Sequence, residues 1–145
     1  MNASAAGVAD GPAALDFPEL ALDGPGPLAD AVRDGLPADR FDALLGALDV
    51  PTAELAAALH LSPSTLSRRR RQGRFDVVES DRLVRLAAIV AHAVRVMDGV
   101  EGARDWMTAP ARALGGETPL AYASVEPGAR EVDRLLTRIE HGVFS

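Results

Sequence analysis

The chain of 145 residues has no cysteine, no lysine and few aromatic residues. Without cysteine it can form neither a disulfide bond nor a thiolate metal site. Aromatic residues make up 4% of the chain and hydrophobic residues 48%, so the core must consist mainly of Leu, Ala and Val. These residues suit packed helices better than a β-sandwich, and we expect an all-α fold.

Long hydrophobic runs are absent as well. No apolar run approaches the roughly 18 residues needed to span a bilayer. The N-terminus also lacks a basic stretch followed by an apolar one. Because the absence of cysteine is compatible with a reducing compartment, we expect a cytoplasmic protein without a membrane partner.

Patterns typical of catalytic and metal sites are missing too. The three histidines, His60, His92 and His141, are far apart in sequence, and none has the spacing of metal ligands. The chain has no G-x-x-x-x-G-K-[ST] or G-x-G-x-x-G stretch, and Thr118 and Ser124 have no evident base. We expect no catalytic residue, no metal and no cofactor, and hence a protein that is not an enzyme.

The formal net charge is −6, and the two signs are unevenly distributed. Residues 1–54 have ten carboxylates and two arginines, whereas residues 68–85 have seven arginines and three carboxylates. The net negative charge argues against a protein that coats nucleic acid non-specifically. The basic segment is nevertheless compatible with phosphate contacts at one local site. Residues 1–36 are rich in Gly, Pro, Ala and Asp without sustained periodicity, and we expect them to form an acidic, disordered arm.

Helical hydrophobic spacing begins after this arm. Phe41, Leu44, Leu45 and Leu48 share one face of a predicted first helix. A second helix follows, with Thr52 as its predicted N-cap.

A third short helix is predicted directly after the second. Ser62 suits its N-cap and Pro63 its first position, and Gly73 ends it after Gln72. His60 lies where many helix-turn-helix motifs have a glycine with positive φ, a conformation that histidine adopts at some cost. The small or apolar residues that suit the close crossing of the second and third helices are Ala56, Leu61 and Leu66. This pattern predicts a helix-turn-helix DNA-binding region over residues 37–76.

The stretch LSRRRRQGR holds four consecutive arginines at the end of the predicted third helix. In a helix-turn-helix the N-terminal residues of this helix face base edges, and the basic residues that follow lie near phosphates. The predicted base-reading residues are Ser64, Thr65 and Arg68. The predicted phosphate-binding residues are Arg69, Arg70, Arg71 and Arg74. Alternatively, the arginines favour the negative end of the helix dipole and stay solvated.

Residues 77–97 form the longest predicted helix, in which Ser80 or Asp81 can serve near the N-terminus, and the helix is apolar nearly all round. Such a helix is buried either by a second copy of the chain or another protein, or as the central core helix of one chain. A homodimer would also suit an operator with two half-sites about 34 Å apart. The last predicted helix follows Pro127 and ends at Gly142, which suits a C′ residue.

Three stretches resemble a known family: LHLSPSTLSRRRRQGRFDVVESDRLVRLAAIV, ARDWMTAPARALGGETPL and EPGAREVDRLLTRIEHGVFS. They resemble antitoxins of the Xre/MbcA/ParS type with their C-terminal toxin-binding domain. The resemblance spans residues 37–145 and is most specific at Trp106 to Pro110, at Ala113 to Leu120 and in the final GVFS. It implies an Xre-like helix-turn-helix bundle followed by a small helical toxin-binding and dimerisation domain, which with the long helix covers residues 77–145.

The resemblance also implies partners. Members of this family neutralise RES-domain toxins, which act on NAD, or related ADP-ribosyl-transferring toxins, and many bind their own operator DNA. The chain would then be a type II antitoxin that covers a toxin's active site and autoregulates its operon, within a homodimer or a higher toxin–antitoxin complex. The residues that the resemblance assigns to the toxin interface are Arg138, Glu140, Gly142, Val143, Phe144 and Ser145. Alternatively, Phe144 caps the final helix within its own domain.

Two features depart from the family pattern, the segment LAYASVEPG and the long acidic arm, and they leave the toxin subtype open. A second interpretation of the chain is a stand-alone helix-turn-helix regulator whose C-terminal domain serves dimerisation or ligand sensing. Both interpretations predict DNA binding. They differ in the role of residues 142–145. Deletion of these residues should weaken toxin binding by an antitoxin while DNA binding survives, whereas a stand-alone regulator should lose its fold or its dimerisation, or show no effect.

Overall fold

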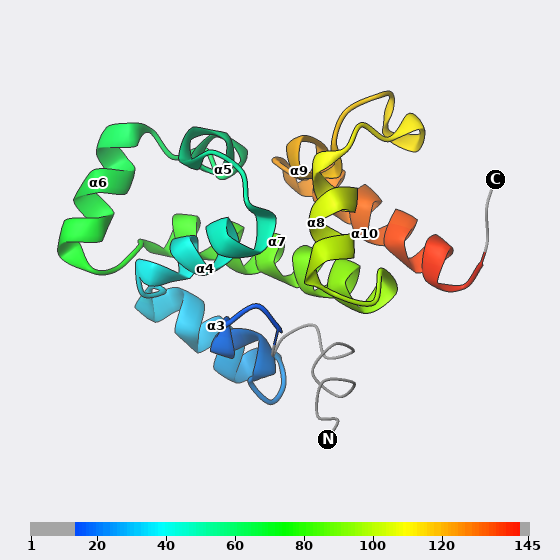
Figure 1. The fold of residues 1–145 in the computed structure, drawn as a ribbon. Coiled ribbons are helices and arrows are strands. Elements are labelled where there is room, and N and C mark those ends of the chain that lie inside the picture. Colours follow the sequence, from blue (N-terminus) through cyan, green and yellow to red (C-terminus); the bar gives the residue numbers. More distant parts are fainter. Residues whose placement is uncertain (1–13, 143–145) are drawn as a thin grey trace, which may run out of the picture.

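The computed structural model describes residues 14–142 as helices arranged around one long helix, α7 (Val77–Val96) (Figure 1). Residues 1–13 and 143–145 lie outside the described part of the chain. No β-strand occurs in the described part, where the one β-bridge joins Pro37 and Arg74, and the all-α prediction is confirmed. Before α7 come η1 (Pro18–Ala21), α3 (Pro25–Asp34), α4 (Asp39–Leu48), α5 (Thr52–Ala58) and α6 (Pro63–Gln72). After it come α8 (Val100–Thr108), η2 (Arg112–Leu114), α9 (Pro119–Tyr122) and α10 (Glu126–Glu140).

Helix α7 is the central core helix of a single chain. It packs against η1, α3 and α4 as well as against α8 and α10. Its buried hydrophobic residues are Leu83, Leu86, Ala87, Ile89, Val90, Ala91, Ala93 and Val94. Of the two interpretations of this apolar helix, the structure supports burial within one chain, so the burial of α7 does not require a second copy.

Helix α7 starts at Val77, the first residue of the predicted range, but neither Ser80 nor Asp81 is its N-cap. The N-cap is Asp76, whose carboxylate accepts a hydrogen bond from the Glu79 backbone N–H at 2.8 Å, while the Glu79 carboxylate accepts one from the Asp76 backbone N–H at 2.9 Å. This reciprocal capping box satisfies two amides that the helix start leaves without partners. Ser80 lies inside the helix instead, where its fully buried hydroxyl accepts a hydrogen bond from the Leu36 N–H at 2.8 Å.

The N-terminal segment also differs from the prediction, because its described residues 14–36 are ordered by the core. Leu15 and Phe17 are 2% and 1% exposed. The Glu19 carboxylate accepts two hydrogen bonds from the Arg40 guanidinium, at 2.7 and 3.0 Å. The Gly and Pro residues that suggested disorder lie at the ends of short helices here. A few apolar side chains pack into the core and hold the segment in place.

The glycine at position 35 allows a close backbone approach. Its φ is 89°, and a Cβ atom at this position would lie 2.4 Å from the Phe75 carbonyl oxygen. The neighbouring segments pair through two backbone hydrogen bonds of 2.9 Å, from Ala38 N–H to Gly73 O and from Phe75 N–H to Leu36 O. This pairing joins the end of α6 to the segment before α4.

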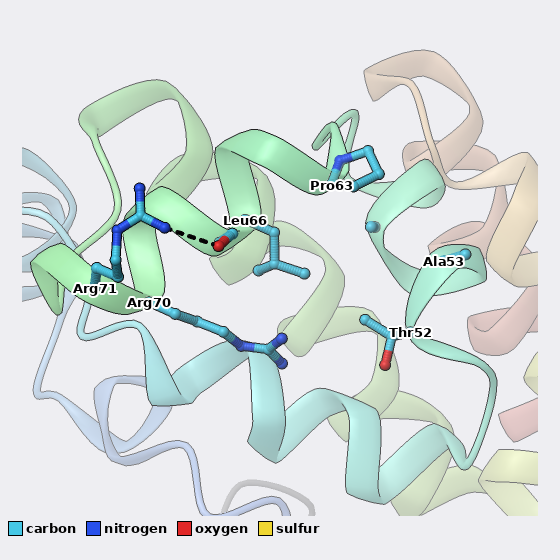
Figure 2. A pocket seen from close by; sticks show the side chains of 8 residues that line it. Thr52, Ala53, Pro63, Leu66, Arg70 and Arg71 are labelled. Atoms are coloured by element: carbon cyan, nitrogen blue, oxygen red, sulfur yellow. Dashed lines mark hydrogen bonds between the residues drawn. The ribbon is translucent and has the colours of Figure 1, made fainter.

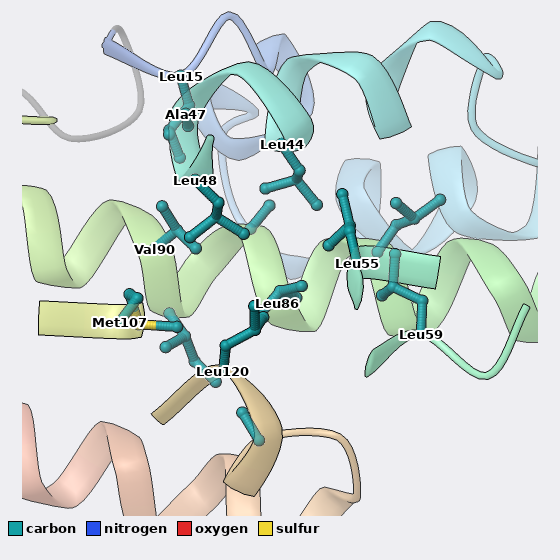
Figure 3. Packing of buried hydrophobic residues seen from close by; sticks show 14 of the residues in the cluster. Leu15, Leu44, Ala47, Leu48, Leu55, Leu59, Leu86, Val90, Met107 and Leu120 are labelled. Carbon is teal, nitrogen blue, oxygen red and sulfur yellow. The ribbon is translucent and has the colours of Figure 1, made fainter. Parts of the chain in front are cut away.

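One continuous hydrophobic core extends through the molecule. Figure 3 shows Leu48 of α4, Leu86 of α7, Met107 of α8 and Leu120 of α9 directed toward a common interior. Leu48, Met107 and Leu120 are each at most 1% exposed. The N-terminal and C-terminal helices therefore share a core. Among residues 14–142, no helix combines the length and the apolar character needed to cross a membrane.

If the segment just before η1 is part of this core, the variant Phe17→Ala should lose about 3–5 kcal/mol of unfolding free energy, because it opens a large cavity at a fully buried position. The control is Leu22→Ala, at a side chain that is 41% exposed, which should lose less than about 0.5 kcal/mol. Urea unfolding followed by circular dichroism measures both. Equal losses in the two variants would show that the segment does not pack on the core.

Candidate functional site

Helices α5 and α6 form the predicted helix-turn-helix. The residues at their crossing are buried, with Ala56 at 5%, Leu61 at 6% and Leu66 at 4% exposure. The turn is closed by a 2.8 Å hydrogen bond from the Leu61 N–H to the Ala56 carbonyl. His60 has a φ of 57°, so the prediction of a left-handed residue at this position is confirmed. Thr52 is the first residue of α5 rather than its N-cap, which is Pro51.

The start of α6 is held by Ser62. Its hydroxyl accepts a hydrogen bond from the Thr65 N–H at 3.1 Å and donates one to the Thr65 hydroxyl at 2.9 Å. The N-cap prediction is therefore confirmed. Ser64 is exposed at the first turn and Thr65 is half-buried beside the cap, so of these two predicted base-reading residues Ser64 is the more accessible.

Between the two helices lies an open groove that is mostly apolar. Figure 2 shows Leu66 directed into the groove, Thr52 and Ala53 on its α5 side, and Arg70 and Arg71 at its edge. Arg71 donates a hydrogen bond from Nη1 to the Ser67 hydroxyl at 3.0 Å, drawn as a dashed line in Figure 2. Both residues belong to α6, so this bond keeps the Arg71 guanidinium on the exposed side of the helix.

The structure gives the four consecutive arginines different surroundings, beginning with Arg69. Its guanidinium donates two hydrogen bonds to the Glu79 carboxylate, at 2.7 and 3.1 Å, and one to Asp76 at 3.2 Å. Glu79 is only 8% exposed, and its hydrogen bonds raise the pKa of Arg69. Arg69 therefore ties the end of α6 to the start of α7, because a nearly buried carboxylate requires a cationic partner. Its contact with phosphate stays a prediction.

Arg70 is also paired, but at the surface. Its guanidinium is 2.7 Å from the Asp42 carboxylate and lies over the Phe41 ring at 5.2 Å from the ring centre. Its side chain is 41% exposed, and such a pair between exposed groups is worth little and is weakened by salt. Arg70 can therefore exchange Asp42 for another anion.

The remaining cations of the cluster are Arg68 and Arg74. Arg68 is exposed and makes no hydrogen bond or ion pair with the described residues. Arg74 donates to the Gly35 carbonyl beside the backbone pairing that precedes α4. Two predicted cations, Arg68 and Arg71, thus remain directed to solvent along α6, while Arg69 and Arg74 serve the fold.

The predicted toxin-binding residues that the structure describes lie in the last turns of α10 and just after it. Arg138 lies 3.6 Å from Glu131, and hydrogen bonding from Arg134, with further attraction from Arg138, lowers the pKa of Glu131. Gly142 has a φ of 71°, which confirms it as the C′ residue of this helix. The other three predicted toxin-binding residues, Val143, Phe144 and Ser145, lie outside the described residues.

Sequence reasoning missed the contacts of two histidines. His92 of α7 is nearly buried and has a carboxylate of α10 beside each ring nitrogen: Asp133 at 2.8 Å and Glu140 at 3.2 Å. His60 Nε2 lies 2.7 Å from the Ser124 carbonyl oxygen, which links the turn of the helix-turn-helix to the segment before α10. A histidine between apolar residues of a buried helix could have indicated a polar partner for His92. No feature of the sequence indicated the contact of His60.

The two candidate sites lie at opposite ends of the molecule. Helix α6 is at one end of α7, and the last turn of α10 is at the other (Figure 1). Within the described residues, no group of three or more His, Asp or Glu side chains is arranged to hold a metal ion. The fold is thus that of a helix-turn-helix protein with a second helical unit. The last helix of this unit ends away from α6, the recognition helix of the helix-turn-helix.

Comparison with known proteins gives the class of each half. Residues 27–88 match the family model of the antitoxin Xre-like helix-turn-helix domain, and residues 92–142 match that of the antitoxin Xre/MbcA/ParS C-terminal toxin-binding domain. The two matches are separated by a short stretch inside α7, whereas the sequence predicted a boundary at its start. The chain thus combines a DNA-binding domain with a toxin-binding domain.

Three proteins named antitoxin Xre are similar over most of their length. The one from Yersinia enterocolitica is 37% identical over 120 residues, which cover 81% of each chain. The one from Photorhabdus laumondii is 32% identical and covers 83% of each chain. The one from Pseudomonas putida is 31% identical over 90% of this chain and 80% of its own. The chain belongs to the Xre family of antitoxins.

The different roles of adjacent arginines can be tested by unfolding. Arg69→Gln should lower the Tm by about 5–10 °C, because it leaves the Glu79 carboxylate without its cation. The matched control is Arg68→Gln, one residue earlier on the same helix, where the exposed side chain has no partner among the described residues and the Tm should change by less than about 2 °C. Differential scanning calorimetry measures both. A Tm for Arg69→Gln as high as that of the control would show that the network does not hold α6 to α7.

Proposed function

We propose that this antitoxin neutralises a toxin of the RES type, which consumes NAD, by covering the active site with the C-terminal end of α10, and that it represses its own operon through α6. The observation that carries this proposal is the separation of the two sites. Because α6 and the last turn of α10 lie at opposite ends of α7, one chain has room for DNA and a toxin at the same time.

The toxin-binding part of the proposal is supported by the exposed end of α10. Arg138 is half-buried and Glu140 is exposed, and the apolar residues Val143 and Phe144 follow Gly142 in the sequence. An apolar side chain next to an exposed helix end suits a nucleotide pocket built for an apolar ring. Burial of Phe144 alone would contribute roughly 2 kcal/mol of transfer free energy.

The DNA-binding part is supported by the accessible residues of α6. In this arrangement Ser64, Thr65 and Arg68 would read base edges, and Arg71 would contact phosphate. Arg70 would join them after giving up Asp42, whereas Arg69 and Arg74 act by holding the helix in place. We propose further that a homodimer presents two such helices to a two-fold operator, through a surface other than the covered faces of α7.

Removal of residues 143–145 tests the toxin interface. The shortened chain should bind the toxin encoded beside it at least about 30-fold more weakly, which is the effect of losing about 2 kcal/mol of apolar burial. Calorimetric titration measures the affinity, and growth together with cellular NAD during co-expression measures neutralisation. The control is Val125→Ala at an exposed site before α10.

An antitoxin should lose toxin binding on this deletion and keep DNA binding. If the deletion leaves toxin affinity unchanged, the tail does not cover the active site. If the full-length chain neither binds the neighbouring gene product nor restores growth, the chain acts as a stand-alone regulator.

The salt dependence of operator binding tests the assignment of the arginines. Log affinity should fall linearly with log salt, and Arg71→Gln should reduce the slope by about 0.9, because it removes one phosphate contact. Arg68→Gln should relax base preference instead. Arg112→Gln, an exposed arginine in η2, is the control and should leave the slope unchanged. Slopes that do not differ among the three variants would contradict DNA contact through α6.

A further inference from the structure

We propose that His92 is a positioning residue for toxin binding, because it holds the last turn of α10 in a fixed orientation through Glu140. This inference rests on the proposed toxin-binding role of α10. His92 lies on α7, far from the helix-turn-helix, and its imidazole lies beneath two carboxylates of the opposite helix.

The geometry is that of a clamp across the α7–α10 interface. His92 Nδ1 is 2.8 Å from an Asp133 carboxylate oxygen, and His92 Nε2 is 3.2 Å from a Glu140 carboxylate oxygen. The two acidic residues are seven positions apart, which is about two turns, so they share one face of α10. The imidazole side chain is 10% exposed, whereas the two carboxylates are about half exposed.

The chemistry of the contact follows from the two ring nitrogens. Ionised carboxylates only accept hydrogen bonds, so each contact forms through a ring nitrogen that carries a proton. A hydrogen bond to an ionised carboxylate is charge-assisted, and such bonds are stronger than neutral ones. A hydrophobic residue would fill the same space in α7, but it could not restrain the carboxylates.

The end of α10 has few other restraints within the described residues. Leu136 is the last residue of the helix that is fully buried; Arg138 and Ile139 are half-buried, and Glu140 to Gly142 are exposed. Helix ends without buried contacts fray. The bond between His92 and Glu140 therefore fixes the residues from which the C-terminal tail continues.

A fixed tail origin matters because ordering a segment during binding costs affinity. If the last turn of α10 already has its bound orientation in the free antitoxin, that cost is reduced before the toxin arrives. Loss of the clamp would transfer the cost to the binding step. His92 would thus affect toxin affinity although its ring is almost covered by its own chain.

The first test measures the clamp in the free protein by amide hydrogen exchange. In His92→Leu, which keeps an apolar side chain of similar size in the core, residues 139–142 should exchange about tenfold faster, as expected for the loss of a hydrogen bond to a charged group. Residues 129–132, at the start of the same helix, should be unchanged. Glu140→Ala removes the same bond from the exposed side and should give the same result if His92→Leu does not fold.

The second test measures binding to the co-encoded toxin. His92→Leu and Glu140→Ala should each weaken it about tenfold, and the double variant should be no weaker than Glu140→Ala alone, because both changes break one interaction. His92→Gln should recover part of the affinity, since its amide can still donate to one carboxylate. DNA affinity should be unchanged in all of them. Arg130→Ala, which removes a surface pair with Glu126 on the same helix, is the control.

The outcomes separate this inference from the proposed function. Unchanged exchange in residues 139–142 would overturn the clamp. Faster exchange with unchanged toxin affinity would overturn the positioning role while leaving the antitoxin function intact. Additive losses in the double variant would show that His92 affects toxin binding independently of Glu140, which also contradicts the proposal. Failure of the wild-type chain to bind toxin would contradict the proposed function itself.

Discussion

The orientation of the recognition helix depends on the buried ion pair between Arg69 and Glu79. Glu79 also completes the capping box with Asp76, so one carboxylate starts α7 and holds the end of α6. An acidic chain can therefore carry a run of arginines in which one member serves the fold and its neighbours remain available to anions. Because the pair is nearly buried, it holds its geometry when salt weakens the surface pair between Arg70 and Asp42.

The two ends of the molecule are separate in space, but a shared core and hydrogen bonds connect the helices between them. Besides the shared core, the Arg104 guanidinium of α8 donates to the Ala47 carbonyl of α4 at 3.0 Å, and His60 contacts the Ser124 carbonyl. These contacts join the DNA-binding half to the toxin-binding half. The chain is thus built as one folded unit.

Sequence patterns predicted the helices of the DNA-binding region well, because caps such as Ser62 and breakers such as Gly73 act locally. They failed for residues 14–36, where the order comes from Phe17 inserting into a core contributed by distant helices. They also gave Arg69, Arg70 and Arg71 one common role. Neighbouring positions on a helix point in different directions, and only the fold shows that Arg69 faces Glu79 while Arg68 faces solvent. The clamp at His92 depends on α10 packing against α7, which no local pattern records.

Hydrogen exchange of the complex with the co-encoded toxin tests most directly whether the two functions use opposite ends of the chain. Compared with the free antitoxin, the bound antitoxin should show much slower amide exchange in the last turns of α10, over residues 135–142, and unchanged exchange in α6. Slower exchange in residues 62–74, with α10 unaffected, would show that the toxin binds the helix-turn-helix instead.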